Sequence, residues 1–343
     1  MQAVQLIAPG KPLESRELPS PRPAGDDVVI DVRAAGICRS DVHYRSGFPR
    51  VGPLPLTLGH EVAGVVATTG SDVVTVTPGM RVCVHYQVGC GGCQYCTSGF
   101  EQFCPEGNMI GNGRPGGYAQ QIMVPERNVI PVPEAVPLDH AAVMMCSSST
   151  SLHALRKGRL APGESVAVFG AGGLGMSAIQ LAFLEGATSV YAVNINPAKL
   201  TAAESLGAIP VDAAAAVAEI RVASGGVDVA LDLVGSATVM RQCLDVLAPM
   251  GRAVAVGLTP DTIRVGPYTD MVSGEAELIG ASDHLSSEIV ELLDHAAAGR
   301  LDLDEVVQRS VPLEADAINA VLDDLEQFGD TVRTVIEPVP DPN

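Results

Sequence analysis

The sequence contains no tryptophan, and phenylalanine and tyrosine together make up only 3% of its 343 residues. Basic residues are also scarce, since 21 Lys and Arg face 40 Asp and Glu and give a net charge of −19. A chain this acidic repels polyphosphate, so we expect no nucleic-acid partner. Hydrophobic residues nevertheless make up 47% of the chain, and Val, Ala and Leu must fill its interior.

Long apolar runs are absent as well. No stretch reaches the roughly 18 apolar residues that predict a membrane-spanning helix. The first ten residues, MQAVQLIAPG, lack the charged and then apolar order of a signal peptide. We therefore expect a cytoplasmic protein with no membrane partner.

The length and the hydrophobic pattern predict two domains. Short β-branched runs at Val28–Ala34 and Glu61–Thr69 indicate a mainly β domain, which we place at residues 1–147 and 286–343. From residue 148 to 285, strand-like runs alternate with helix-length segments, which predicts an α/β domain with a doubly wound parallel sheet of the Rossmann type. The strands expected in that domain are Ser165–Phe169, Ser189–Val193, Val227–Leu233, Arg252–Val256 and Leu278–Ala281.

A glycine motif lies at the start of the α/β domain. The segment VAVFGAGGLG places Gly170, Gly172 and Gly175 in a G-x-G-x-x-G pattern, with Gly173 inside it, directly after a predicted strand. In this pattern the first glycine permits a tight turn, the second lets a pyrophosphate approach, and the third lets the helix lie close to the strand. The motif therefore predicts a dinucleotide site; a glycine-rich structural turn is the alternative.

The choice between NAD and NADP depends on the end of the next predicted strand. An acidic residue that binds the adenosine ribose is typical there, but this sequence has Asn194. An amide can still hydrogen-bond a ribose hydroxyl, and it would not repel a 2′-phosphate. No arginine follows, and Lys199 is the nearest cation, so we expect NAD without excluding NADP.

Four of the eight cysteines lie within fifteen residues. Their segment, CGGCQYCTSGFEQFC, contains Cys90, Cys93, Cys96 and Cys104. Four thiolates on one glycine-rich loop predict a closed, structural zinc site, because they leave no position open for a substrate. Buried or disulfide-bonded cysteines, or an iron–sulfur cluster, are the alternatives.

Three separate segments hold the residues that an open zinc site needs, namely Cys38, His60 and Cys146. Two thiolates and an imidazole leave a fourth position for a substrate oxygen, and zinc there favours loss of an alcohol proton. Hydride can then pass to a nicotinamide ring. The spacing of these residues alone does not establish them as ligands.

The motifs, taken in order, resemble the zinc-dependent medium-chain alcohol dehydrogenases over essentially the whole chain. The matching segments are Cys38-Arg39-Ser40-Asp41-x-His43, Gly59-His60-Glu61, the four-cysteine loop, Cys146 and GAGGLG. The resemblance implies a GroES-like catalytic domain beside the Rossmann domain, two Zn²⁺ ions per chain, and NAD or NADP as the cosubstrate. It also implies a homodimer or homotetramer, and a small alcohol, aldehyde or ketone as the substrate.

The resemblance also implies roles around the catalytic zinc. Cys38, His60 and Cys146 resemble its ligands. Glu61 resembles the nearby carboxylate that approaches the metal during ligand exchange, and Asp41 the partner that orients His60. Ser40 and His43 resemble a proton relay from the substrate hydroxyl to solvent.

Three further residues resemble cofactor contacts. Arg39 and Arg333 resemble arginines that contact the pyrophosphate, and Thr150 resembles a residue beside the nicotinamide. Tyr86 resembles a residue of the substrate pocket. Two rival functions stay open: a polyol dehydrogenase of the same fold, and a nucleotide-binding relative without catalytic activity. The polyol enzymes often have Glu where Cys146 stands, so simple alcohols are favoured.

Overall fold

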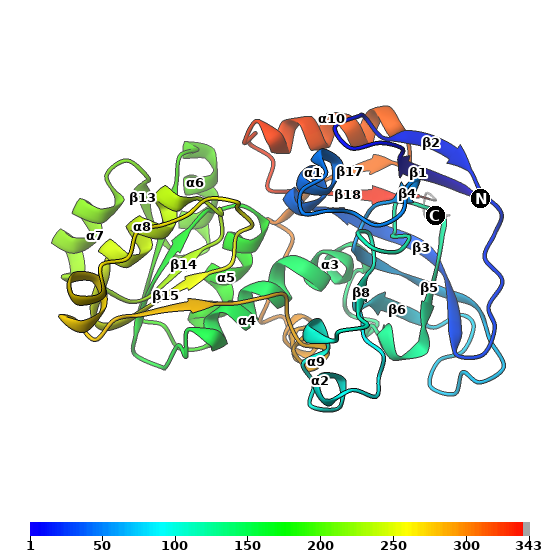
Figure 1. Ribbon diagram of the computed structural model, residues 1–343, viewed down its shortest axis with the longest axis horizontal. Helices are drawn as coiled ribbons and strands as arrows, with labels where there is room; N and C mark the ends of the chain where they lie inside the picture. Colours follow the sequence, from blue (N-terminus) through cyan, green and yellow to red (C-terminus); the bar gives the residue numbers. More distant parts are fainter. Residues whose placement is uncertain (339–343) are drawn as a thin grey trace. The chain divides into compact units, whose positions relative to one another are not determined.

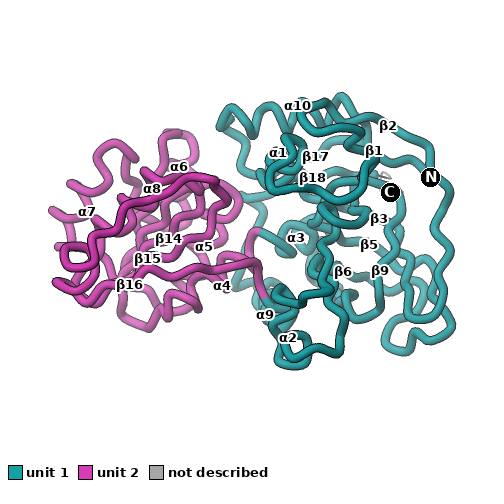
Figure 2. Tube along the Cα trace, viewed as in Figure 1, with its two compact units in different colours: residues 1–146, 285–343 teal, residues 147–284 magenta. Residues whose placement is uncertain are grey.

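The computed structural model describes residues 1–338 and divides the chain into two compact units, coloured in Figure 2. Unit 1 comprises Met1–Cys146 and the described residues from Leu285 onward, and unit 2 comprises Ser147–His284. The chain therefore passes from one unit to the other twice. Because unit 1 is made from both ends of the sequence, its core joins residues that are far apart along the chain.

Unit 1 is built around a seven-stranded mixed sheet (Figure 1). Its strands follow the order β10-β6-β5-β3-β18-β17, and β9 also pairs with β3. The central strand β3 (Asp27–Ile37) is buried along most of its length, because Val, Ile and Ala occupy both of its faces. The other strands of this sheet are β5 (Glu61–Thr69), β6 (Arg81–Val84), β9 (Gln121–Pro125), β10 (Val129–Pro131), β17 (Val307–Pro312) and β18 (Arg333–Glu337).

Smaller elements complete unit 1. A three-stranded sheet has the order β2-β1-β4, and β7 pairs with β8. These strands are β1 (Gln2–Leu6), β2 (Glu14–Glu17), β4 (Leu56–Thr57), β7 (Gln87–Val88) and β8 (Asn108–Met109). The helices are α1 (Arg39–Ser46), α2 (Gln94–Thr97), α3 (Leu138–Val143), α9 (Ser286–Ala297) and α10 (Ala315–Glu326), with 3₁₀ turns η1 (Glu101–Phe103) and η2 (Glu126–Asn128). A π-helical turn, η3 (Met144–Ser148), contains the first passage between the units.

Unit 2 contains a six-stranded parallel sheet in the order β13-β12-β11-β14-β15-β16, which confirms the predicted doubly wound fold. The strands are β11 (Ser165–Phe169), β12 (Ser189–Asn194), β13 (Ile209–Asp212), β14 (Val227–Asp232), β15 (Leu247–Ala255) and β16 (Glu277–Gly280). The helices are α4 (Ser149–Lys157), α5 (Gly173–Leu184), α6 (Pro197–Ser205), α7 (Ala216–Ser224) and α8 (Ala237–Asp245), with a π-helical turn η4 (Pro267–Val272). Ser236 caps α8, since its hydroxyl accepts a hydrogen bond from the Val239 N–H.

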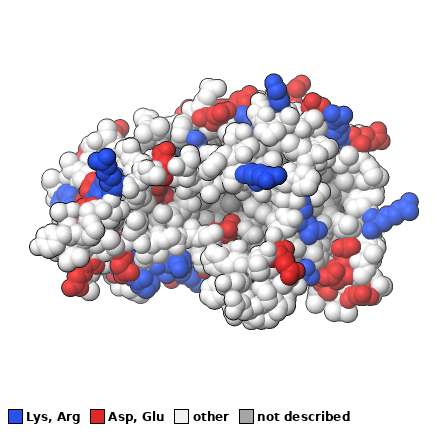
Figure 3. Space-filling model, viewed as in Figure 1, with Lys and Arg blue, Asp and Glu red and all other residues white. Residues whose placement is uncertain are grey.

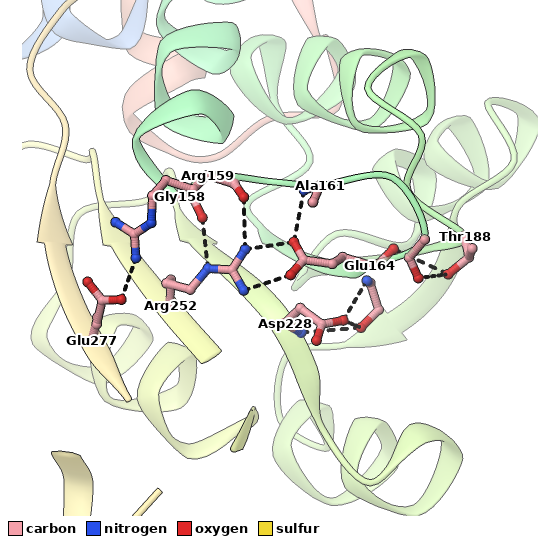
Figure 4. A network of polar contacts seen from close by, with 10 residues as sticks. Gly158, Arg159, Ala161, Glu164, Thr188, Asp228, Arg252 and Glu277 are labelled. Carbon is pink, nitrogen blue, oxygen red and sulfur yellow. Dashed lines mark hydrogen bonds and ion pairs between the residues drawn. The ribbon is translucent and has the colours of Figure 1, made fainter. Parts of the chain in front are cut away.

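A polar network ties the loop after α4 to the parallel sheet (Figure 4). The Arg252 side chain on β15 makes two hydrogen bonds to the Glu164 carboxylate, at 3.0 and 2.6 Å. It also donates to the carbonyl oxygens of Gly158, at 2.8 Å, and Arg159, at 3.1 Å. One buried guanidinium therefore fixes both the end of α4 and the turn that leads into β11.

Basic and acidic side chains are intermixed on the one face of the molecule that is drawn space-filling (Figure 3). On the face shown in Figure 3, the blue Lys and Arg side chains stand singly or in small groups, with red Asp and Glu side chains among them. Within residues 1–338, no helix has both the length and the apolar character that crossing a membrane requires.

Candidate metal centres and dinucleotide loop

The first cluster of possible metal ligands lies inside unit 1. Candidate ligand atoms of Cys38, His60, Glu61 and Cys146 all lie within 4.8 Å of one another, and all four residues are buried. Cys38 directly follows β3 and precedes α1, His60 directly precedes β5, and Cys146 lies in η3. Three separate segments thus bring one donor set to a single point.

The donor atoms fit a zinc ion. Two sulfurs at 2.3 Å from one tetrahedral zinc would lie about 3.8 Å apart, and Sγ of Cys38 lies 3.9 Å from Sγ of Cys146. Nε2 of His60 is buried and has no hydrogen-bond partner among the described residues. Such a nitrogen is costly to bury unpaired, and a metal would satisfy it. The hydrogen bond with Cys146 also lowers the pKa of Cys38 well below its usual value, which favours the thiolate.

Asp41 fixes the orientation of His60. Its Oδ1 lies 3.3 Å from Nδ1 of His60, while Oδ2 accepts hydrogen bonds of 2.9 Å from the Cys38 N–H and the Tyr118 hydroxyl. Burial lowers the pKa of His60, but the Asp41 carboxylate and the Cys38 thiolate together outweigh burial and raise that pKa well above its usual value. With Nδ1 turned toward Asp41, Nε2 is the nitrogen left for a metal.

Glu61 forms a buried ion pair with Arg333. Nη2 of Arg333 contacts Oε1 of Glu61, and Nη1 donates to the carbonyl oxygen of Ile37 at 3.0 Å. Burial raises the pKa of Glu61 to about 8, although Arg333 opposes this shift. Gly36 leaves room for the carboxylate, because a Cβ there would lie 2.0 Å from Oε2 of Glu61.

The second cluster lies in the loop from Cys90 to Cys104, called the cysteine lobe below. Sulfur atoms of Cys90, Cys93, Cys96 and Cys104 lie within 4.8 Å of one another. All eight cysteines of the chain are free thiols, so the disulfide alternative finds no support. The 3.6 Å between Sγ of Cys93 and Sγ of Cys96 suits a shared tetrahedral metal. Backbone N–H groups of Gly92 and Cys93 lower the pKa of Cys90 to about 7.

The glycine motif of unit 2 forms the turn between β11 and α5. Gly170 has φ +103°, a conformation that favours glycine. A Cβ on Gly175 would lie 1.9 Å from the carbonyl oxygen of Gly170, so this position must stay bare. A Cβ on Gly172 would meet nothing within 4 Å, which leaves open space before the N-terminus of α5. Bare backbone and an open helix N-terminus suit a phosphate group.

Known proteins match the chain over nearly its full length. The model of the alcohol dehydrogenase GroES-like domain matches residues 24–134, and that of the zinc-binding dehydrogenase domain matches residues 173–298. The NAD-dependent alcohol dehydrogenase of Sulfurisphaera tokodaii is 34% identical over 98% of this chain and 100% of its own length. This chain belongs to the zinc-dependent medium-chain alcohol dehydrogenases. As a member of that family it is an oxidoreductase.

Solved structures of this dehydrogenase family match equally well. The alcohol dehydrogenase of Aeropyrum pernix gives a TM-score of 0.91 at 31% identity and covers 98% of this chain and 100% of its own. The 2R,3R-butanediol dehydrogenase of Bacillus subtilis gives a TM-score of 0.90 at 28% identity, covering 98% and 99%. Both predicted domain folds, the GroES-like and the Rossmann domain, are thus confirmed.

Two residues of the expected proton relay lie on α1 of this dehydrogenase. Oγ of Ser40 lies 3.3 Å from Sγ of Cys38, so the hydroxyl is close to the first metal cluster. His43 lies one turn further along the same helix and is half-buried. Burial and the nearby Arg39 lower the pKa of His43, which keeps its imidazole neutral near pH 7.

The expected cofactor residues have other contacts in this structure. The Arg39 guanidinium donates to the carbonyl oxygen of Leu325 at 2.8 Å and lies 3.9 Å from the centre of the Phe328 ring. Arg333, described above, lies against Glu61 in the metal cluster. Oγ1 of Thr150 on α4 is buried and has no hydrogen-bond partner in the part of the chain described. Asn194 ends β12, and its Oδ1 accepts from the Asn196 N–H at 2.9 Å.

Two tyrosine rings contact the His60 ring, and a third tyrosine binds Asp41. Of the three, the motifs predicted only Tyr86. The Tyr86 ring meets the His60 ring edge to face, with centroids 5.3 Å apart, and the Tyr44 ring does so at 6.0 Å. Tyr118 binds Asp41, as described above. No motif predicts the role of Tyr118, because its contact with Asp41 spans 77 residues. The available signal was Gly59, where a Cβ would lie 2.3 Å from the Tyr118 ring.

Proposed function

We propose that this chain is a zinc-dependent alcohol dehydrogenase that transfers hydride between a primary or secondary alcohol and NAD. The observation that carries the proposal is the buried trio of Cys38, His60 and Cys146. Its two sulfurs lie 3.9 Å apart and its imidazole Nε2 lacks a partner among the residues described. Such a set holds zinc and leaves one position for a substrate oxygen.

Each cluster holds one zinc ion in this proposal. Cys38, His60 and Cys146 hold the catalytic ion, and the cysteine lobe holds a structural one, so each chain carries two. The catalytic zinc supplies a Lewis acid for the substrate oxygen, and the nicotinamide ring accepts the hydride. Asp41 keeps Nε2 of His60 directed at the metal position, and Glu61 supplies a nearby carboxylate for ligand exchange.

The chain itself removes the alcohol proton. The Ser40 hydroxyl lies close enough to Cys38 to contact a substrate oxygen bound beside that sulfur. In this proposal the hydroxyl takes up the substrate proton as it passes its own proton on toward the neutral imidazole of His43, which releases a proton to solvent. The lowered pKa of His43 is compatible with this role, because a neutral imidazole has a free nitrogen to receive the proton and releases it readily to solvent.

The glycine turn of unit 2 binds the pyrophosphate of the cofactor. Gly170, Gly172, Gly173 and Gly175 form the turn and the first residues of α5, and a Cβ on Gly172 would meet nothing within 4 Å. We favour NAD, as in the relative from Sulfurisphaera tokodaii, and NADP stays open because Asn194 carries no charge to repel a 2′-phosphate. Arg39, Thr150 and Arg333 contact the bound cofactor in this proposal.

The remaining assignments concern the assembly and the place of action. We assign unit 1 as the catalytic domain and unit 2 as the cofactor-binding domain. The working form is a homodimer or homotetramer in the cytoplasm, which agrees with a family of symmetric oligomers. Size measurement in solution tests the first expectation.

The deciding experiment replaces single buried cysteines. Cys146→Ala should reduce the zinc content from two ions per chain to one and abolish NAD-dependent oxidation of a small alcohol panel. Cys243→Ala, at an equally buried cysteine of unit 2, is the matched control and should retain both zinc ions and full activity. Cys104→Ala should lose the other zinc and lower thermal stability. Full activity without Cys146 would refute the assignment.

A diol or polyol is the second candidate substrate. The similarity to a butanediol dehydrogenase favours it, since a second hydroxyl beside the reacting one is compatible with the same fold. Competition between a simple alcohol, a vicinal diol and a sugar alcohol separates the two. A higher kcat/KM for the diol would make it the better assignment.

A further inference from the structure

One carboxylate connects the cysteine lobe to two other segments of unit 1. Oε1 of Glu101, in the 3₁₀ turn η1 of the lobe, lies 3.0 Å from Nε2 of His85. The same oxygen accepts a hydrogen bond of 3.0 Å from the backbone N–H of Ser286, the first residue of α9. Leu285, just before it, begins the second part of unit 1. A single oxygen thus joins segments that lie 16 and 185 residues away.

On the lobe side, Glu101 lies among the cysteines. The N–H of Cys104 donates to the Glu101 carbonyl oxygen at 3.0 Å. A Cβ on Gly89 would lie 2.6 Å from Sγ of Cys96 and 3.3 Å from Cβ of Glu101, so both residues pack against the same bare backbone. The position of Glu101 therefore depends on how the four cysteines are held.

On the other side, His85 leads to the first metal cluster. Its ring stacks on that of Tyr86, with centroids 6.0 Å apart, and Tyr86 meets His60 edge to face at 5.3 Å. The side-chain amide of Asn128 fixes the backbone here, because it donates to the carbonyl oxygens of His85 and Gln87. With the backbone fixed, the contact with Glu101 sets the direction of the His85 ring.

The residues that link Glu101 to His60 are buried, which strengthens the contacts between them. His85 and Tyr86 are each 2% exposed, and His60 is 1% exposed. The Glu101 side chain is 15% exposed, so its charge is held mostly away from solvent. A charged acceptor in such surroundings holds its donors more tightly than a neutral one. Loss of that acceptor would free the His85 ring to turn, and the Tyr86 ring packed on it would follow.

We propose that Glu101 is a positioning residue that couples the cysteine lobe to the catalytic site through His85 and Tyr86. The inference rests on the proposed function, since it takes the first cluster as the catalytic zinc site. When the lobe holds its metal, Glu101 keeps His85 and Tyr86 in place against His60. When the lobe loses it, this support relaxes and the wall of the catalytic site shifts.

Kinetic and spectroscopic measurements on Glu101→Gln test the coupling. Gln keeps the size of Glu101 and removes its charge. We expect KM for an alcohol to rise at least about threefold, less than the 10- to 100-fold that loss of a direct partner of a metal ligand costs. Because the proton relay and hydride transfer are untouched, kcat should change less than KM.

Cobalt provides a readout that does not depend on turnover. The spectrum of the cobalt-loaded protein, minus that of cobalt-loaded Cys146→Ala, reports the Cys38 site alone. We expect Glu101→Gln to shift this difference spectrum while both metal ions stay bound. Glu14→Gln is the control, because it is the same kind of substitution in the same unit: Glu14 pairs with Arg16 at 2.7 Å, and neither residue belongs to a metal cluster. It should shift neither KM nor the spectrum.

Replacement of His85 completes the test. His85→Leu removes the ring that stacks on Tyr86 and should raise KM as Glu101→Gln does, and combining the two substitutions should raise KM no further. An unshifted cobalt spectrum and unchanged KM in Glu101→Gln, with lowered thermal stability alone, would mean that the contact is only structural. Failure of the parent protein to bind cobalt at the Cys38 site would instead refute the proposed function itself.

Discussion

Replacing Asp41 by Asn should selectively weaken the catalytic zinc site. The carboxylate accepts from the Cys38 N–H and the Tyr118 hydroxyl, and it faces Nδ1 of His60. The Asn side chain that replaces Asp41 has one carbonyl oxygen. This oxygen can accept from the Cys38 N–H and the Tyr118 hydroxyl only if the NH₂ group faces Nδ1 of His60. His60 must then accept at Nδ1 and carry its proton on Nε2, which is the wrong tautomer for a metal ligand.

The size of the effect follows from these contacts. Loss of the partner that orients a metal-bound histidine costs about 10- to 100-fold in metal affinity. Exchanging charge-assisted for neutral hydrogen bonds should also lower the free energy of unfolding by about 2 kcal/mol. A smaller loss, about 1 kcal/mol, is expected for Tyr118→Phe, which removes one donor and keeps the carboxylate.

A chelator titration measures this difference. Zinc retained per chain is followed against increasing chelator, and the cysteine-lobe zinc serves as an internal reference. Asp31→Asn is the matched control, because Asp31 lies on β3 and accepts one hydrogen bond from Gln121. If Asp41→Asn holds both zinc ions as tightly as the parent protein, the orienting role of Asp41 is wrong.

Three further predictions concern stability and cofactor binding. Arg252→Met should lower the free energy of unfolding by about 3 kcal/mol in denaturant titrations, because the Glu164 carboxylate loses its partner; adding Glu164→Gln should recover part of the loss. Gly172→Ala should leave thermal stability unchanged yet weaken NADH binding measured by fluorescence, whereas Gly175→Ala should destabilise the fold by at least about 2 kcal/mol, since its Cβ meets backbone. Burial raises the pKa of Glu101, but His85 and backbone N–H groups, including that of Ser286, together outweigh burial and lower this pKa from 4.5 to about 2. This carboxylate therefore stabilises the fold above pH 4.5 and loses that effect as the pH falls toward 2. Stability of Glu101→Gln should therefore depend less on pH between about 5 and 2 than that of the parent protein; an equal dependence would contradict this shift.

The sequence predicted the elements whose pattern is local. Strand β11 runs from Ser165 to Phe169 as expected, because a short continuous apolar run is typical of a parallel strand that is buried on both faces. Strand β13 (Ile209–Asp212) was missed, since three of its four residues are exposed and Pro210 interrupts the pattern. Strand β17 (Val307–Pro312) was missed for a similar reason, with an exposed run from Gln308 to Ser310.

The candidate site was predictable only where motifs carry it. The resemblance supplied the proposed ligands, but the ion pair between Glu61 and Arg333 spans 272 residues and no local pattern contains it. The contact between Glu101 and Ser286 spans 185 residues. Contacts of this kind depend on how β18 and α9 return to unit 1, which hydrophobic periodicity does not encode.

The two-part construction of unit 1 has a consequence for the order of folding during synthesis. Cys38, His60 and Cys146 are all synthesised before the first strand of the parallel sheet. Strand β18, which pairs with β3 and carries Arg333, is synthesised only after the whole of unit 2. Until it arrives, the Glu61 carboxylate lacks Arg333 and the last residues of β3 lack their β18 neighbour. The nascent chain therefore holds its proposed metal ligands before it can complete the sheet around them.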